Sequence, residues 1–383
     1  MKILPLPEIY SGQNTLNEIN GILDRLQASK IMVITDKGIV NAGIYSQFEA
    51  ILKHGNKEIT LFDSVLPDPS IELVESVVEI ARKSEIQAVI GIGGGSSIDT
   101  AKVVAALIPN TKNISEYIGI ELIENNSLPI IAIPTTAGTG SEVTPIAILS
   151  DEKEQLKKGI VSSKIIPDFA ILDPTLTLKL PPKVTAAAGM DAFIHAIEAF
   201  ISLNANPYTD MMALKAIKII YENIREAYNN GSNIIARDNM LTGSLLAGMA
   251  FANAGVAAVH AFSYPLGGMF HVPHGLANSV MLPSILEYNL VGSEDKYVQI
   301  AGIITGKEES DPNVAVSEIT KLCKDLDIPM SLAEMNIPES AIESMAEAAM
   351  KVTRLLNNNP RKITIEDARQ LYKKAYNGLA CRI

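Results

Sequence analysis

Three of the chain's five histidines lie close together in a segment that carries no charge. His260, His271 and His274 fall between Gly255 and Gly275, and no Asp, Glu, Lys or Arg occurs from Leu241 to Leu286. Imidazoles gathered in apolar surroundings are typical of a metal or catalytic site. The segment is long enough to span a membrane, but its prolines, glycines and histidines favour a buried core lined by functional groups.

A second group of potential ligands lies earlier, in GMDAFIHAIEAF (189–200). Asp191 and His195 are four residues apart, so they share one face of a helix. With His260 and His274 they would supply one carboxylate and three neutral imidazoles, which suits Zn²⁺ or Fe²⁺. The net charge of such a complex, about +1, would leave the metal a Lewis acid. Each histidine alone could be a core residue bonded to a backbone carbonyl, but the combination favours a metal.

A glycine-rich loop follows a predicted strand in VIGIGGGSSIDTAK (89–102). Glycines 93–95 let the backbone approach a ligand closely, Ser96 or Ser97 can cap the next helix, and Asp99 lies in its first turn. The amides at a helix N-terminus bind phosphates. A tight turn that binds nothing would have the same pattern, so this loop alone is weak evidence for a nucleotide.

A second loop of this kind raises the odds of a dinucleotide. In IAIPTTAGTGSEVT (131–144), small and hydroxyl-bearing residues follow a strand, at what should be the same edge of a parallel sheet. Asp36 ends the strand IMVITD, whereas the usual ribose-binding acid follows the glycine loop by about 20 residues. An Asp at this place would bond ribose hydroxyls and repel a 2′-phosphate, which favours NAD over NADP. A turn Asp explains the position equally well.

The pattern of apolar residues predicts the elements that carry these motifs. Apolar strands alternate with helices in the first half, which predicts a parallel sheet covered on both faces. Strands are predicted at 31–36, 58–63, 87–95, 128–136 and 168–174, and helices at 69–84 and 97–107. After Pro181 and Pro182 only helices are predicted, at 185–201, 208–229, 234–252, 275–290, 294–304, 313–326, 338–356 and 364–379. The glycines and the proline in 265–268 are expected to bend the chain between His260 and His274.

The chain is therefore predicted to have two domains. Residues 1–180 form an α/β dinucleotide-binding domain and residues 181–383 an all-helical domain for metal and substrate, since 383 residues exceed what one core usually serves. The net charge of −11 argues against nucleic acid or an anionic membrane as a partner. Two cysteines and an N-terminus without a signal-peptide pattern favour the cytoplasm.

These motifs together resemble a known family. GGGSSIDTAK, PTTAGTGSE and the pair DAFIHAIE and VHAFSYPLGGMFHVPHG look like the iron-containing (group III) alcohol dehydrogenases over nearly the whole chain. The resemblance implies the fold shared with dehydroquinate synthase, a cleft between the two domains, and a homodimer or larger assembly. It implies NAD(H)-linked, metal-dependent interconversion of a small primary alcohol and its aldehyde.

The resemblance also assigns roles residue by residue. It implies metal ligands at Asp191, His195, His260 and His274, and Phe251 matches an aromatic position of the substrate pocket. It implies cofactor contacts at Asp36, Gly94, Gly95, Ser96, Thr135, Thr136, Thr139, Ser141 and Lys158, with Asp99 in the same turn as the glycines.

One position departs from the family. Many members read H-x-x-x-H-P-L-G, but here HAFSYPLGG puts Tyr264 in place of the second histidine. A phenol with a pKa of about 10 is a poor base at neutral pH, although Tyr264 could still donate a hydrogen bond. The sequence leaves four routes open for the proton: Tyr264, His271, water or a ribose hydroxyl. His271 could instead contact an anionic substrate, or be an ordinary loop histidine.

Three alternatives follow from this departure and from the scaffold. The tyrosine resembles the hydroxyacid–oxoacid transhydrogenase branch, so a transhydrogenase, or a reductase of a carboxylated or sulfonated aldehyde, is the second hypothesis. A non-catalytic nucleotide- or metal-binding protein is disfavoured because both loops and all four ligand positions are intact. A metal-dependent lyase resembling dehydroquinate synthase is disfavoured because its motifs differ.

Overall fold

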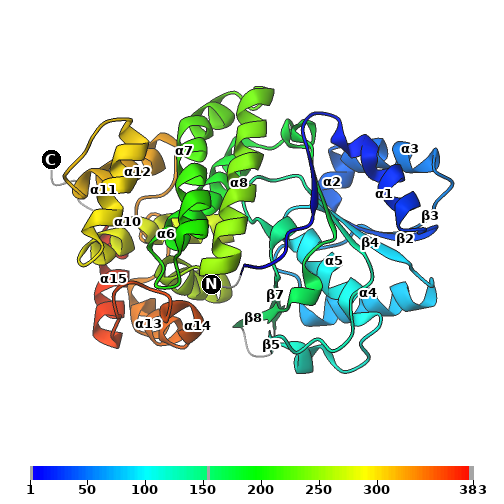
Figure 1. Ribbon diagram of the computed structural model, residues 1–383. Helices are drawn as coiled ribbons and strands as arrows, with labels where there is room; N and C mark the ends of the chain where they lie inside the picture. Colours follow the sequence, from blue (N-terminus) through cyan, green and yellow to red (C-terminus); the bar gives the residue numbers. More distant parts are fainter. Residues whose placement is uncertain (1–2, 153–155, 379–383) are drawn as a thin grey trace. The chain divides into compact units, whose positions relative to one another are not determined.

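The computed structural model describes residues 3–152 and 156–378. The chain divides into two compact units, one spanning Leu4–Leu180 and the other beginning at Pro181. Among the described residues all nine strands lie in the first unit, and the second is built from helices alone (Figure 1). The structure therefore confirms the predicted fold class, an α/β part followed by an all-helical part.

A six-stranded sheet in which every pairing is parallel forms the centre of the first unit. The predicted strands are all present, and the short, half-exposed edge strand β1 was not predicted. A three-stranded sheet was missed as well; one of its strands has only two residues, and the other two have six each. In spatial order the large sheet comprises β1 (Glu8–Ser11), β9 (Phe169–Leu172), β6 (Ile130–Pro134), β4 (Ala88–Gly93), β2 (Lys30–Ile34) and β3 (Glu58–Phe62), and the small sheet β5 (Gly119–Ile120), β8 (Leu156–Val161) and β7 (Ile146–Asp151).

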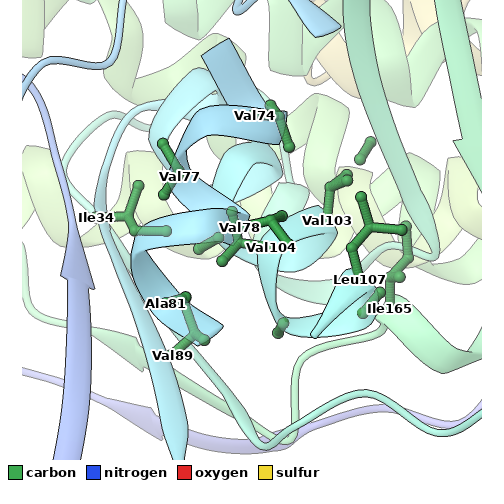
Figure 2. Close-up of a cluster of buried hydrophobic side chains, with 14 of the residues drawn as sticks. Ile34, Val74, Val77, Val78, Ala81, Val89, Val103, Val104, Leu107 and Ile165 are labelled. Carbon is green, nitrogen blue, oxygen red and sulfur yellow. The ribbon is translucent and has the colours of Figure 1, made fainter. Parts of the chain in front are cut away.

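Helices cover both faces of the large sheet, as the apolar strands predicted. Successive residues of β2 point to opposite faces, so Met32 and Ile34 enter one core cluster while Ile31 and Val33 enter the other. Figure 2 shows the first cluster, in which valines of α4 (Ile71–Lys83) and α5 (Gly95–Leu107) pack together. The second is covered by α1 (Ile19–Arg25), α2 (Lys37–Asn41) and α3 (Ile44–Lys53).

This topology places three loops at one edge of the sheet. Strands β2, β4 and β6 are neighbours and run parallel, so their carboxyl ends share that edge. Asp36 follows β2, the glycine loop follows β4, and the loop 135–141 follows β6. Ligands of open parallel sheets bind at such an edge.

Helix α6 (Pro182–Ile201) forms the core of the second unit. It starts directly after Pro181, with a proline at the first helical position, where the missing N–H costs nothing. It is long and apolar enough to span a membrane. However, 83% of its most apolar 18-residue stretch is buried inside the protein, as in the core helix of a globular protein. Four helices pack against it: α7 (Pro207–Asn229), α8 (Ile234–Ala254), α9 (Ala258–Phe270) and α10 (His274–Leu290). The unit also contains α11 (Glu294–Thr305), α12 (Asn313–Asp325), α13 (Ile342–Met350), α14 (Thr353–Leu356) and α15 (Ile365–Asn377).

The chain bends between His260 and His274 as predicted, but not at Pro265, Gly267 and Gly268. All three lie inside α9, an element that was not predicted. The chain turns instead after Phe270, where His271 adopts the left-handed conformation with φ 55°. A proline inside a helix removes one backbone hydrogen bond, and here burial of the surrounding apolar side chains offsets that cost.

Candidate functional site

Helix α6 brings two of the predicted ligands together. Asp191 and His195 lie one turn apart on the same face, and both side chains are buried. The ring of Phe251, from α8, stacks on the His195 imidazole with 4.3 Å between ring centroids. The aromatic position assigned to the substrate pocket therefore forms an apolar wall against a predicted ligand.

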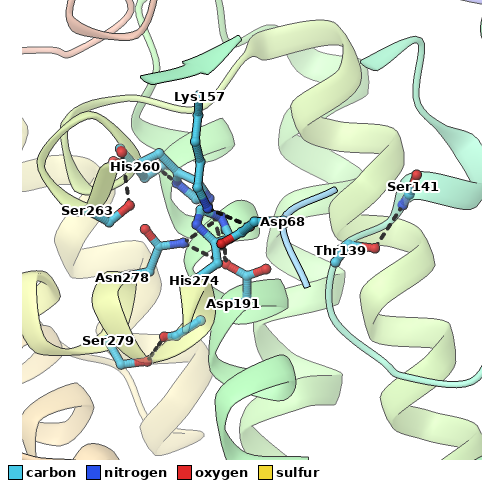
Figure 3. Close-up of polar contacts among 12 residues, drawn as sticks. Asp68, Thr139, Ser141, Lys157, Asp191, His260, Ser263, His274, Asn278 and Ser279 are labelled. Atoms are coloured by element: carbon cyan, nitrogen blue, oxygen red, sulfur yellow. Dashed lines mark hydrogen bonds and ion pairs between the residues drawn. The ribbon is translucent and has the colours of Figure 1, made fainter. Parts of the chain in front are cut away.

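Helices α9 and α10 bring the other two to the same place. The potential donor atoms of Asp191, His195 and His260 all lie within 4.8 Å of one another. His274 Nε2 lies 3.7 Å from Asp191 Oδ1. Figure 3 shows Asp191, His260 and His274 pointing toward one another from three different helices. All four predicted ligands thus converge, although residues 191 and 274 are far apart in the sequence.

The hydrogen bonds of His260 test whether a metal fits. Its Nδ1 lies 2.6 Å from a carboxylate oxygen of Glu198, which can only accept, so Nδ1 carries the proton. Its Nε2 is then an acceptor, buried and without a hydrogen-bond partner among the described residues. It faces a second acceptor, Asp191 Oδ1, at 3.8 Å. Two buried acceptors that face each other are costly without a cation, and one carboxylate with three imidazoles suits a divalent metal.

The charges around Asp191 favour its ionised form. Burial pushes the pKa of this carboxyl upward, but the positive charge that the imidazoles of His195, His274 and His260 carry when protonated outweighs burial and holds the pKa below the ordinary value. Asn278 adds a hydrogen bond from Nδ2 to Asp191 Oδ1 at 2.7 Å. The carboxylate is therefore ready to bind a cation at neutral pH.

Sequence reasoning missed Asn278 and Glu198, although spacing could have indicated both. Asn278 lies four residues after His274 and Glu198 lies seven after Asp191, so each shares a helix face with a predicted ligand. Their role becomes visible only in the structure, because each contacts a predicted ligand on another helix: Glu198 contacts His260, and Asn278 contacts Asp191.

The two residues considered for proton transfer lie in different surroundings. Tyr264 is half-buried, and its ring centroid is 6.3 Å from that of His274. His271 is exposed at the end of α9. Within residues 3–152 and 156–378 it forms no hydrogen bond, ion pair or ring contact with the four ligands.

In the first unit, the glycine loop leaves the start of α5 open. The helix begins at Gly95 with Gly94 as its N-cap and no side-chain cap, so the predicted cap by Ser96 or Ser97 was wrong. Uncapped amides at a helix N-terminus are available to an anion. Gly93 has φ 151°, and a Cβ there would lie 2.7 Å from Ser97 Oγ, so only glycine fits.

The second loop lies directly against the first. A Cβ on Gly95 would come within 2.7 Å of Thr139 Cγ2, and one on Gly94 within 3.6 Å of Thr136 Oγ1. The hydroxyl of Thr135 is buried and has no hydrogen-bond partner in the described part of the chain. The glycines therefore make room for a neighbouring loop as well as for a ligand.

Asp36 lies beside the glycine loop, and its contacts explain it structurally as well. Its carboxylate accepts a hydrogen bond from Ile39 N at 3.1 Å, which caps α2, and Ser97 Oγ lies 3.4 Å from its second oxygen. The side chain is only half-buried, so it can also meet a ligand.

Asp99 and Lys102, both in α5, form hydrogen bonds with the second loop and with the strand that follows it. Asp99 accepts hydrogen bonds from Ser141 Oγ and, at 2.9 Å, from Ile148 N. The fully buried Lys102 ammonium, which sequence reasoning missed, donates to the backbone oxygens of Ser141 at 3.0 Å and Ile146 at 2.6 Å. Burial lowers the pKa of Lys102 to about 8, against the opposing effect of Asp99. These contacts direct Asp99 and Ser141 into the protein, so they would shape the loop rather than touch a ligand.

Lys158 lies in β8 of the small sheet. Its ammonium forms an ion pair with Asp151 at 2.7 Å, across the β7–β8 pairing. The contact with a cofactor that the resemblance implies for Lys158 stays a prediction.

Comparisons with known proteins agree on one family. The model described as "Iron-containing alcohol dehydrogenase" matches residues 7–174, and the one described as "Fe-containing alcohol dehydrogenase family, C-terminal" matches residues 185–376. Long-chain-alcohol dehydrogenase 1 of Geobacillus thermodenitrificans is 39% identical over 97% of this chain and 96% of its own. Sulfoacetaldehyde reductase of Bilophila wadsworthia is also 39% identical, over 92% of this chain and 93% of its own.

Solved structures have the same fold. A 1,3-propanediol oxidoreductase superposes with a TM-score of 0.95 at 36% identity, covering 98% of this chain and all of the other. A sulfoacetaldehyde reductase from Bifidobacterium kashiwanohense, solved in complex with NAD⁺, superposes with a TM-score of 0.89 at 31% identity, covering 98% and 99%.

Replacing His260 with Ala should leave the protein folded but remove stoichiometric Zn²⁺, because one of four ligands and the bare Nε2 are lost. Metal content after dialysis, together with turnover, would measure this. His271→Asn is the matched control, since it changes an exposed histidine to a residue that tolerates a positive φ. Full metal content and activity in His260→Ala would contradict the site.

Replacing Gly95 with Ala should weaken NADH binding, on the order of tenfold or about 1.4 kcal/mol, because the new methyl would displace Thr139 and with it one of the two loops proposed to hold the cofactor. A titration of NADH fluorescence would measure the dissociation constant. Gly21→Ala makes the same change in helix α1, where a Cβ meets nothing within 4 Å. Equal affinity in Gly95→Ala and Gly21→Ala would show that the glycine loop does not hold the cofactor.

Proposed function

The chain belongs to the iron-containing alcohol dehydrogenase family, and from that premise we propose that it interconverts a small primary alcohol and its aldehyde as a metal-dependent, NAD(H)-linked oxidoreductase. The observation that carries the proposal is the buried cluster of Asp191, His195 and His260, in which a bare imidazole nitrogen faces a carboxylate. A buried cation site without positive side chains of its own suits the activation of a substrate oxygen.

The chain's own residues bind and shield the reacting groups. Asp191, His195, His260 and His274 would hold Fe²⁺ or Zn²⁺. When bound, the metal would serve as a Lewis acid toward the substrate oxygen, and NAD(H) would accept or supply the hydride. Phe251 covers the His195 ring and keeps water from that side of the ligands.

The first unit would hold the cofactor. We assign the pyrophosphate to the uncapped amides around Gly94, Gly95 and Ser96, where a helix N-terminus favours negative charge. Asp36, one strand away, would bond the ribose hydroxyls. The remaining contacts are assigned to the second loop and the small sheet, at Thr135, Thr136, Thr139 and Lys158, with Asp99 and Ser141 supporting that loop.

Tyr264 is the better candidate for a residue that touches substrate. Its half-buried ring lies beside His274, whereas His271 is exposed at a helix end. The phenol can donate a hydrogen bond to a substrate oxygen or pass a proton to water. His271 is then left for contacts with the outer part of a substrate.

The enzyme is further proposed to be a cytoplasmic homodimer or larger homo-oligomer that acts on small molecules. Its net charge of −11 supports the absence of nucleic acid and anionic membranes from its partners. The division of roles between a cofactor domain at 1–180 and a metal and substrate domain at 181–383 is part of the same proposal.

A reductase of acidic aldehydes is the second candidate. The 39% identity to a sulfoacetaldehyde reductase favours it. The segment that carries His260 and His274 speaks against it, because it has no Lys or Arg between Leu241 and Leu286 to bind an anion. A hydroxyacid–oxoacid transhydrogenase would differ from both in turning over without added NAD.

A panel of small aldehydes tests the proposal. With Zn²⁺- or Fe²⁺-loaded protein, neutral aldehydes should be reduced faster than carboxylated or sulfonated ones, measured as consumption of NADH. The uncharged segment is the reason, since burying an unpaired anion beside it is costly. Turnover restricted to acidic aldehydes would replace the first candidate by the second, and inertness toward the whole panel would contradict the proposed activity.

Replacing Asp36 with Asn should raise the ratio of kcat/KM for NADP to that for NAD about fivefold, because relief of one like-charge contact is worth on the order of 1 kcal/mol. The Asn can still accept the hydrogen bond from Ile39 N that caps α2. Steady-state kinetics with both cofactors would measure the ratio. An unchanged ratio would mean that Asp36 is only a helix cap.

A further inference from the structure

We propose that Glu198 is a positioning residue for the metal site, which fixes the tautomer of His260 and supplies a second buried negative charge. The inference rests on the proposed function in taking the cluster of four ligands as a metal site. Glu198 lies on the same face of α6 as Asp191 and His195 but bonds to residues of α9.

Every contact of the Glu198 carboxylate is one that it accepts. Oε2 accepts from Ala257 N at 2.9 Å and lies 2.6 Å from His260 Nδ1, and Oε1 accepts from Val259 N at 2.5 Å. The side chain has no solvent exposure. Peptide nitrogens can only donate, so both oxygens are already engaged as acceptors, and the third contact must also be a donor. His260 therefore holds its proton on Nδ1 and presents Nε2 to the cluster.

The same carboxylate starts the helix that carries His260. Helix α9 has Ala257 at its N-cap, which offers no side-chain cap of its own. The first amides of a helix need acceptors, and a negative charge is favourable there. Glu198 meets both needs from α6, so the beginning of α9 and the direction of the His260 ring are set by one group.

The turn before α9 has further support. Asn358 Nδ2 donates to Val256 O at 2.9 Å, and Ser202 Oγ donates to Ala254 O at 2.7 Å. Gly255 packs against the Asn358 amide with φ 76°, a conformation that favours glycine. A conservative change at Glu198 should therefore leave the turn and the fold in place.

The charge balance gives Glu198 a second effect. Asp191 and Glu198 together carry two negative charges, which match a divalent cation bound by neutral imidazoles. Without Glu198 the buried cluster would keep about one unbalanced positive charge, and uncompensated buried charge is costly. A carboxylate bonded to the far nitrogen of a metal-binding histidine also raises the basicity of that ligand.

Replacing Glu198 with Gln should weaken Zn²⁺ binding about 10- to 100-fold, because the amide N–H₂ faces a donor and the negative charge is lost. Competition with a chelating indicator would measure the affinity of the metal alone. Glu318→Gln is the matched control: its carboxylate accepts a hydrogen bond from Tyr221 in the same unit, at 2.9 Å, and its affinity for Zn²⁺ should stay within about twofold.

The tautomer of His260 distinguishes a positioning role of Glu198 from a purely structural one, because a purely structural role would leave the tautomer unchanged. In metal-free protein with ¹⁵N-labelled histidine, NMR should show His260 protonated on Nδ1 in the wild type and in Glu318→Gln, and a mixture in Glu198→Gln. A His260→Asn spectrum assigns the signals. The wild-type measurement stands even if Glu198→Gln does not fold.

Three results would overturn the inference: a wild-type His260 protonated on Nε2, an unchanged tautomer in Glu198→Gln, or undiminished Zn²⁺ affinity in that variant. Failure of the proposed function looks different, because the wild-type protein would then bind no Zn²⁺ or reduce no aldehyde. Loss of affinity together with loss of the fixed tautomer would support the inference.

Discussion

Two buried acceptors that face each other, His260 Nε2 and Asp191 Oδ1, are the constraint on which the site depends. Asn278 donates to Asp191 Oδ1, but in the described chain nothing donates to His260 Nε2, and a bound cation would satisfy both atoms at once. This explains why imidazoles gather in the least charged segment. A Lys or Arg there could pair with Asp191 and take the cation's place, and water would weaken the field of a bound metal.

In the first unit two backbone loops lie against each other, at the place where the pyrophosphate of the cofactor is proposed to bind. The parallel sheet aligns the strand ends, and glycines remove the side chains that would keep the loops apart. Lys102, which is buried, and Asp99 then fix the position of the second loop through hydrogen bonds to the strand that follows it. In the proposed enzyme, separate sets of residues, one in each unit, would bind the cofactor and the metal.

Most of this could be predicted where the signal is local. The spacing of Asp191 and His195 indicated a shared helix face, and apolar strands indicated the parallel sheet, because both patterns depend only on near neighbours. Glu198 and Lys102 were missed because their roles come from partners on other elements. Helix α9 was missed because Pro265 suggested a break that burial overrides. The assignment of each ligand and cofactor contact remains a prediction.

Anomalous X-ray scattering at the zinc edge, from crystals grown with Zn²⁺, tests the central claim most directly. If the four residues form a metal site, one strong peak per chain is expected, bound by Asp191, His195, His260 and His274 at about 2.0–2.2 Å. A peak elsewhere, or a fully ordered cluster without metal in which a proton joins Asp191 to His260 Nε2, would contradict it. In a metal-free cluster of that kind, the protein itself would satisfy His260 Nε2 and Asp191 Oδ1. The proposed role of these two atoms as metal ligands would then be wrong.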